Sequence, residues 1–488
     1  MEATKTQEFA RATVRGAAWT YVTFYGGKFM VFISTVILAR LLTKEDFGIF
    51  GFALAATSFL EVLQDLGVGP ALIYQRKSDE VAHTAFWLGI GISSCLFILT
   101  WLIAPWFGTF FGDPRAVPVT RALAFSFPLF ALSNVHDILL QKELAWGHKF
   151  IPETSKQFSK GFLSILFALL GFGFWSLIIG QLGGRVVAAF AYWRTIPWRP
   201  KFQFAREHAR SLLSYGSNIV GVNLFGILMA NADYFLIFRY LGAAALGAYT
   251  VAFRIPELII MQFCNVVGAV IFPVYAKMRD DPEALTRGFA VTMQYVALVT
   301  LPLGLGLAMV AEPFVLTVFG ERWVDSIPVM RAISIYAMLF SLSYNAGDVY
   351  KAQGRPEVLT KLAPVRAVVL IVGFWYAITQ VGTIEAVGWA HAVAALIAGA
   401  VNLVVAARML HLPLTGVVAA LRPAVVGSSL MTLAVLGTLS LVAGAAPVVQ
   451  LAASILVGAL TYALALCVLQ RDVLLGAGVT LRAAMKRA

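Results

Sequence analysis

The sequence predicts an all-α polytopic membrane protein with about fourteen transmembrane helices, and three properties of the chain lead to that fold class. Of its 488 residues, 60% are hydrophobic and 13% are charged, whereas soluble globular chains are about a quarter charged. The mean hydropathy is +0.81. The apolar residues also fall into runs of about 20, the length that crosses a hydrocarbon core about 30 Å thick as a helix. A bilayer is therefore the expected solvent for most of the chain.

Fourteen runs meet this length in order along the chain. Their approximate limits are 17–38, 46–68, 83–107, 119–140, 157–173, 174–193, 213–238, 246–272, 289–311, 329–349, 362–380, 386–407, 417–441 and 449–469. The fifth and sixth runs are contiguous, so Gly171 and Gly173 must turn the chain between them. Pro128, Pro256 and Pro302 lie inside spans and predict kinks there, because proline removes a backbone donor and clashes with the preceding turn.

The basic residues predict how these helices are oriented. With fourteen spans both termini lie on one side, and that side carries 25 of the 37 Lys and Arg residues. The opposite loops carry five, which are Arg40, Lys44, Arg115, Arg239 and Arg322. Because basic residues gather in cytoplasmic loops, both termini are expected in the cytoplasm. The longest expected loops, 141–156 and 194–212, are too short for a separate catalytic domain.

Several functional classes are disfavoured by composition and spacing. A net charge of +12 would suggest nucleic-acid binding in a soluble protein, but the cytoplasmic bias and anionic lipid headgroups account for it here. Cys95, Cys264 and Cys467 are far apart and inside apolar runs, so they predict no disulfide framework. The sequence shows no metal-ligand spacing, phosphate-binding glycine loop or nucleophile elbow. We expect no cofactor, no metal, no nucleic-acid partner and no enzymatic activity.

A weak internal repeat links the two halves of the chain. Residues 39–53 read ARLLTKEDFGIFGFA and residues 238–252 read FRYLGAAALGAYTVA. At a constant offset of 199, Arg40 matches Arg239 and Gly48 matches Gly247; chance matching of small residues in apolar sequence is the alternative. Because six helices is an even number, such a repeat is parallel, as in transporters that hold substrate between two lobes near mid-membrane.

The repeat predicts a division of the chain into three parts. An N-lobe of helices 1–6 covers residues 1–212, and a C-lobe of helices 7–12 covers 213–410. A terminal helix pair, 13–14, with a cytoplasmic tail covers 411–488.

Ionisable residues within spans are the first candidate functional residues, because each costs about 2.5–3.5 kcal/mol on insertion scales and normally faces a cavity or a partner. Three cations, Lys28, Arg185 and Arg254, lie at broadly similar depth on three spans. We expect at least two of them to face a shared aqueous cavity. Such a cavity suits an anionic substrate such as a phosphate or pyrophosphate.

Acidic and amide residues are the second set of candidates, as ion-pair or coupling groups and as further substrate contacts. The acidic residues are Glu61, Asp65, Asp233 and Glu257, and the amides include Asn223 and Asn231. Glu61 and Asp65 could instead pair structurally with Arg15 or Lys77, and Glu257 with Arg254 at i,i+3. The amides could bind sugar hydroxyls or hold helices together, and the sequence favours neither reading.

Four segments resemble one family of transporters. LARLLTKEDFGIFGFALAATSFLEVLQDLGVGPALIYQRK (38–77) resembles the first two spans of bacterial polysaccharide and lipopolysaccharide flippases, with an acidic-Phe-Gly turn and a closing D-L-G. LLQKELAWGHKF (139–150) is similar to their basic loop after span 4. LGAYTVAFRIPELII (246–260) and IFPVYAKMRDDPE (271–283) are similar to their span 8 and its exit.

The resemblance implies a member of the multidrug/oligosaccharidyl-lipid/polysaccharide exporter superfamily with two lobes. Its implied activity is translocation of undecaprenyl-pyrophosphate-linked oligosaccharide by alternating access through a cationic central cavity. By the resemblance, Lys28 and Arg254 are the foremost substrate-binding candidates, followed by Arg15 and Arg185. The implied partners are the lipid-linked anionic oligosaccharide, membrane lipids, and a polysaccharide polymerase and glycosyltransferases. A multidrug or small-molecule antiporter of the same superfamily, and a membrane polymerase or glycosyltransferase, are the alternatives.

Overall fold

The structure is a computed structural model that describes residues 26–27, 29–65, 72, 79–143 and 145–470. Within these ranges it does not describe the side chains at 65, 146, 211, 214–225 and 414. The described residues form helices joined by turns and short loops, and none of them lies in a strand. The all-α prediction is therefore confirmed.

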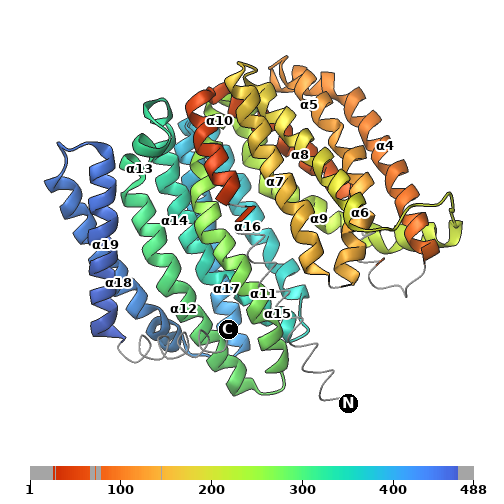
Figure 1. The fold of residues 1–488 in the computed structure, drawn as a ribbon. Coiled ribbons are helices and arrows are strands. Elements are labelled where there is room, and N and C mark those ends of the chain that lie inside the picture. Colours follow the sequence, from red (N-terminus) through yellow and green to blue (C-terminus); the bar gives the residue numbers. More distant parts are fainter. Residues whose placement is uncertain (1–25, 28, 66–71, 73–78, 144, 471–488) are drawn as a thin grey trace. The chain divides into compact units, whose positions relative to one another are not determined.

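The chain divides into two compact units, residues 1–247 and 248–488. Unit 1 contains the helix Phe29–Leu41, α2 (Lys44–Asp65), α4 (Asp79–Phe111), α5 (Ala116–Ala124), α6 (Ser126–Lys142), α7 (Trp146–Leu169), α8 (Phe174–Thr195), α9 (Arg206–Tyr240) and the first turns of α10 (Gly242–Pro256) (Figure 1). The sequence-based boundary at 212/213 follows the repeat rather than packing, and it stays a prediction.

Unit 2 begins within α10 and runs to the C-terminal end. It contains a π-helix (Glu257–Met261), α11 (Gln262–Lys277), α12 (Pro282–Met309), α13 (Ala311–Val318), a 3₁₀ turn (Glu321–Trp323), α14 (Ser326–Tyr344), α15 (Ala346–Ala352), α16 (Glu357–Tyr376), a second π-helix (Ala377–Val381), α17 (Ile384–Met409), α18 (Leu414–Leu441) and α19 (Pro447–Leu469).

Each of the fourteen predicted spans falls on one or more of these helices. Among the described residues, eleven helical stretches are long and apolar enough to cross a membrane, and one of them, Gly226–Lys277, is long enough for two crossings. The short apolar helix Phe29–Leu41 covers the described part of the first span. α7 is absent from the eleven because its first half carries several charged residues.

The predicted breaks follow the local chemistry of proline and glycine. The fourth span is interrupted between α5 and α6 at Phe125, close to Pro128, and the π-helix of the eighth span follows Pro256 directly. α12 continues through Pro302. Gly171 and Gly173 have φ of +83° and +53°, a backbone region that glycine adopts without a Cβ clash.

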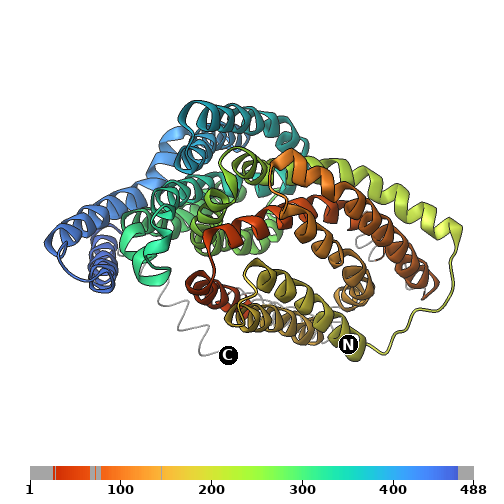
Figure 2. The same cartoon turned by 90° about the horizontal axis from the view of Figure 1, so that it is seen from above.

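The two predicted loops are shorter than the sequence suggested. α7 begins at Trp146 and α9 at Arg206, so much of 141–156 and the end of 194–212 are helical. Charged residues there mark the polar face of a helix rather than a loop. The true connection, 196–205, runs extended from α8 to α9 (Figure 2). It is attached to α4, because Lys201 N donates to His83 Nδ1 at 3.2 Å and Trp87 Nε1 donates to Lys201 O at 2.8 Å.

The two segments of the internal repeat pack against each other within unit 1. A Cβ on Gly48 of α2 would overlap the carbonyl oxygen of Ala243, and a Cβ on Gly247 of α10 would overlap that of Lys44. Lys44 and Ala243 are themselves 199 residues apart. The contact is therefore reciprocal, as expected for equivalent residues of a repeat.

Candidate functional site

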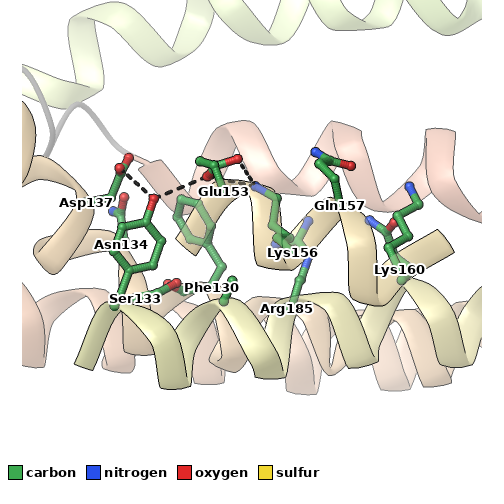
Figure 3. Close-up of a pocket in the computed structure, with 12 residues that line it drawn as sticks. Phe130, Ser133, Asn134, Asp137, Glu153, Lys156, Gln157, Lys160 and Arg185 are labelled. Atoms are coloured by element: carbon green, nitrogen blue, oxygen red, sulfur yellow. Dashed lines mark hydrogen bonds and ion pairs between the residues drawn. The ribbon is translucent and has the colours of Figure 1, made fainter. Parts of the chain in front are cut away.

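A polar cavity of about 280 Å³ lies in unit 1 among α6, α7 and α8 (Figure 3). Its walls combine charged, amide and hydroxyl side chains with apolar surface such as that of Phe130 and Ala188. The lining residues are Phe130, Ser133, Asn134, Asp137, Glu153, Lys156, Gln157, Lys160, Gln181, Arg185, Ala188 and Tyr192. Such a concentration of polar groups on helices of a membrane protein marks a candidate functional site.

α7 supplies one wall of the cavity because its polar residues recur at helical spacing. Lys149, Glu153, Lys156 and Lys160 are separated by four, three and four residues, which places them on one side of a helix. The last three line the cavity. The charges that keep α7 from resembling an ordinary apolar span therefore serve this site.

Small residues of α8 bring the opposite wall close to α7. A Cβ on Gly180 would lie 2.6 Å from Lys160 O, and one on Gly184 would lie 2.8 Å from Lys156 O. Both distances are shorter than real Cβ contacts, so only glycine allows this approach. Close packing of α8 on α7 positions Gln181 and Arg185 at the cavity.

A network of charged groups joins the three helices at one end of the cavity. Tyr192 Oη on α8 lies 2.8 Å from Asp137 Oδ1 on α6 and 3.2 Å from Glu153 Oε1 on α7. Lys149 Nζ lies 2.7 Å from Asp137 Oδ1, and Lys156 Nζ lies 2.9 Å from Glu153 Oε2. Each carboxylate thus has its own ammonium partner, and the buried tyrosine hydroxyl connects the two pairs.

Arg185 forms the second charged contact of the site. Its Nη2 lies 2.5 Å from Oε1 of Glu61 on α2, and its guanidinium carbon lies 6.0 Å from the ring centre of Phe130. The two charged side chains are 17% and 32% exposed. An arginine has five N–H donors, so Arg185 can hold Glu61 and still bind a second anion in the cavity.

The lining carries charged groups of both signs, and Glu61 adds a further carboxylate next to Arg185. Lys156, Lys160 and Arg185 contribute three positive charges, while Asp137 and Glu153 contribute two negative ones. Lysine and arginine donate charge-assisted hydrogen bonds that are about twice as strong as neutral ones. The remaining polar residues, Ser133, Asn134, Gln157 and Gln181, offer donors and acceptors that match sugar hydroxyls.

Two of the residues predicted from sequence lie at this site. Arg185 lines the cavity, and Glu61, which the sequence paired with Arg15 or Lys77, contacts Arg185 among the described residues. Lys28 and Arg15 lie outside the described residues, as do the side chains of Asp65 and Asn223. Gly27, next to Lys28 in sequence, lies beside the cavity residue Gln157, since a Cβ on Gly27 would be 3.2 Å from Gln157 Cγ.

The other predicted residues do not line this cavity. Asn231 donates from Nδ2 to Ile227 O of its own helix at 2.9 Å, and Asp233 is buried in α9. Arg254 belongs to unit 2, where its Nη1 lies 3.9 Å from Glu257 Oε2. The local ion pair considered for these two residues is therefore present.

Sequence reasoning missed most of the cavity. Asp137, Glu153, Lys156, Lys160 and Tyr192 were not among the predicted site residues. Glu153 and Lys156 were missed because 141–156 was read as a loop. The three-and-four spacing of the charged residues from Lys149 to Lys160 could have identified the helix. Among the described residues, no group of three or more His, Cys, Asp and Glu side chains could hold a metal ion.

A family model described as "Polysaccharide biosynthesis protein" matches residues 37–328, more than half of the chain. The chain belongs to this family. The matched region of this polysaccharide biosynthesis protein includes α2 and the three helices that form the cavity.

Relatives from several bacteria extend the match to about three quarters of the chain. The teichuronic acid biosynthesis protein TuaB of Bacillus subtilis is 27% identical over 387 residues, which cover 78% of this chain and 80% of the relative. The succinoglycan biosynthesis transport protein ExoT of Rhizobium meliloti is 25% identical over 381 residues, with 78% and 77% covered.

The fold of this polysaccharide biosynthesis protein also matches a solved transporter structure. The inward closed conformation of the lipid II flippase MurJ superposes with a TM-score of 0.75 at 14% sequence identity, covering 93% of this chain and 99% of that one. At this identity the likeness shows the fold. The chain is thus a multi-pass membrane protein with a transporter fold.

Proposed function

We propose that the protein flips a lipid-linked, negatively charged oligosaccharide across the bacterial inner membrane for surface polysaccharide biosynthesis. The observation that carries the proposal is the polar cavity of unit 1, whose lining has more cations than carboxylates. Membership of the polysaccharide biosynthesis family and the transporter fold support it. Two of the relatives are named for teichuronic acid biosynthesis and for succinoglycan transport.

The cavity chemistry suggests how such a substrate is held. In this proposal Lys156, Lys160 and Arg185 bind the oxygens of the phosphate groups that link sugar to lipid. The two lysines bind through a single ammonium charge each, and the arginine through two parallel N–H groups of its guanidinium. The amide and hydroxyl residues of the lining bind the first sugars. The lipid tail stays in the bilayer, because burying each CH₂ in hydrocarbon is worth about 0.8 kcal/mol.

The proposal includes the orientation and the wider site expected from the sequence. With both termini cytoplasmic, the end of the cavity at Asp137 and Lys149 opens toward the cytoplasm, where the substrate is made. Alternating access then exposes the bound headgroup to the other side.

Lys28, Arg254 and Arg15 are proposed as further cations on the substrate path. A polymerase and glycosyltransferases are proposed as partners that use and supply the substrate, and the protein itself acts as a transporter without catalysing bond chemistry.

Two other functions were considered from the sequence. A multidrug antiporter for cationic compounds requires an acidic binding site, and the three cations that line this cavity would repel such cargo. A membrane polymerase or glycosyltransferase requires room for catalytic groups outside the membrane. Among the connections that the structure describes in full, the longest, 196–205, has ten residues, too few for such a domain.

Reconstitution tests the proposal directly. The full chain would be placed in liposomes that contain a fluorescent polyprenyl-pyrophosphate-linked oligosaccharide, and an impermeant quencher would report the fraction exposed on each side. We expect the protein to equilibrate this lipid between leaflets, and not to export ethidium as a cationic drug probe. Ethidium transport without lipid equilibration would support the antiporter instead.

A further inference from the structure

Unit 2 contains a buried carboxylate that the proposed flipping cycle leaves without a role. Asp348 lies on α15 within the candidate span Ser326–Ala352 and is 7% exposed. Its Oδ1 accepts a hydrogen bond from Lys351 Nζ at 3.2 Å. Its Oδ2 is buried and has no hydrogen-bond partner among the described residues. An ionised oxygen in that position loses its hydration without compensation.

Two tyrosine hydroxyls occur on the helices that pack around Asp348, and neither is within hydrogen-bond distance of Oδ2. If Gly268 of α11 carried a Cβ, that atom would lie 3.0 Å from both Asp348 Oδ2 and Tyr344 Cε1. Both side chains therefore pack directly against the backbone of Gly268. The Tyr344 hydroxyl donates its hydrogen to Asn265 Oδ1 at 2.7 Å, which leaves the lone pairs of its oxygen available. Tyr275 on α11 is also buried, and its hydroxyl has no hydrogen-bond partner among the described residues.

We propose that Asp348 is a proton-binding site, in which Oδ2 takes up one proton from water and α15 packs on α11 around the neutral carboxyl. The proton comes from the aqueous side that Lys351 reaches, since the lysine side chain is 49% exposed. When the proton is released, Asp348 becomes a charged carboxylate that is stable only if water hydrates it. Hydration requires α15 to separate from α11. Use of this equilibrium to drive transport rests on the proposed function.

The charged and titratable groups around Asp348 are few. α15 contributes Lys351, α14 contributes Tyr344, and α11 contributes Tyr275 and Cys264. α16 and α17 also contact α15, but among the described residues neither places a charged side chain within ion-pair distance of Asp348. Among the described residues Lys351 is thus the one cation within ion-pair distance of Asp348.

A proton fits this site better than a metal ion. Sodium and divalent ions need several oxygen ligands, and among the described residues no group of three or more His, Cys, Asp and Glu side chains that could hold a metal ion includes Asp348. The nearby amide oxygen of Asn265 already accepts the Tyr344 hydroxyl. A single buried carboxylate oxygen without a partner in the described part of the chain needs only one proton to lose its charge.

Infrared spectroscopy of the full chain in lipid vesicles tests the proposal, with the proton as the only probe. A protonated carboxyl gives a C=O band separate from that of carboxylates, and a pH titration follows it. We expect a band at neutral pH that is lost in Asp348→Asn. The control Asp280→Asn, at a side chain that is 89% exposed, should keep it. Asp348→Glu should move the band, which assigns it even if the asparagine variant fails to fold.

A variant of the ion-pair partner separates a proton site from a purely structural ion pair. Lys351→Gln should retain the band. A band that is absent from the unmodified chain and appears only in Lys351→Gln would overturn the proposal, as would appearance of the band only on removal of sodium. These measurements need no lipid-linked substrate, so their failure is distinguishable from failure of the proposed flipping activity.

Discussion

Gly48 on α2 and Gly247 on α10, which match each other in the predicted internal repeat, pack in direct contact. A Cβ added to Gly247 would lie 3.1 Å from the amide nitrogen of Gly48. Each glycine also accommodates a carbonyl oxygen of the opposite segment. The two matched glycines therefore form one close contact, and each must lack a side chain for the two helices to approach this far.

Alanine at this contact should destabilise the protein. In Gly48→Ala the new methyl group would overlap the backbone of Ala243, and forced overpacking typically costs about 1–3 kcal/mol. The measurement is the thermal midpoint of the purified protein in detergent. Gly89→Ala on α4 is the matched control, because nothing lies within 4 Å of its added Cβ. Equal midpoints for the two variants would contradict the close contact.

The contact between Arg185 and Glu61 predicts a rescue. Arg185→Gln leaves Glu61 without its described partner and should lower stability, by less than the roughly 3–5 kcal/mol of a fully buried pair because both side chains are partly exposed. Glu61→Gln combined with Arg185→Gln should restore stability. Arg331→Gln, which breaks the exposed contact with Glu312, is expected to change stability little. A double variant no more stable than Arg185→Gln would argue against the pair.

Tyr192 should contribute stability through its hydroxyl alone. Tyr192→Phe keeps the ring and removes the connection between Asp137 and Glu153, while Lys149 and Lys156 still neutralise both carboxylates. The expected cost is about 1 kcal/mol, the usual net value of one hydrogen bond. Chemical denaturation of the two proteins measures it. Tyr376→Phe at a residue 61% exposed serves as the control and should have no effect.

The orientation assumed for the cavity has its own test. Because the predicted topology places 25 basic residues on the side of the termini, a cytoplasmic reporter enzyme fused after Ala488 should be active, and a reporter that works only in the periplasm should be silent. The opposite pattern would place the Asp137 end of the cavity outside the cell.

The sequence predicted the helices well because hydropathy depends on local composition. All fourteen spans fall on helices, and the Gly171–Gly173 turn lies between α7 and α8 as expected. The site was harder to predict. Arg185 was found because a charge in an apolar run is conspicuous, whereas Lys156 and Glu153 were assigned to a loop because they neighbour other charges.

The remaining features depend on how helices rotate and pack, which composition does not determine. The partner of Glu61 is 124 residues away on α8, and no local spacing indicates it. Tyr192 was overlooked because a tyrosine near the end of a span usually lies at the membrane interface, while here it is buried between two carboxylates. The close approach that Gly180 and Gly184 allow likewise becomes meaningful only once α7 is known to be their neighbour.

The most direct test of the account is the flipping rate of a cavity from which the lining cations have been removed. Lys156→Gln and Lys160→Gln, combined with the stabilised Glu61→Gln/Arg185→Gln pair, remove the three cations that line the cavity. Arg279→Gln, at a side chain that is 63% exposed, is the control. In liposomes with fluorescent polyprenyl-pyrophosphate oligosaccharide, we expect the control to match the unmodified protein and the cavity variant to lose flipping while it stays folded. A folded cavity variant that flips at the unmodified rate would contradict the account.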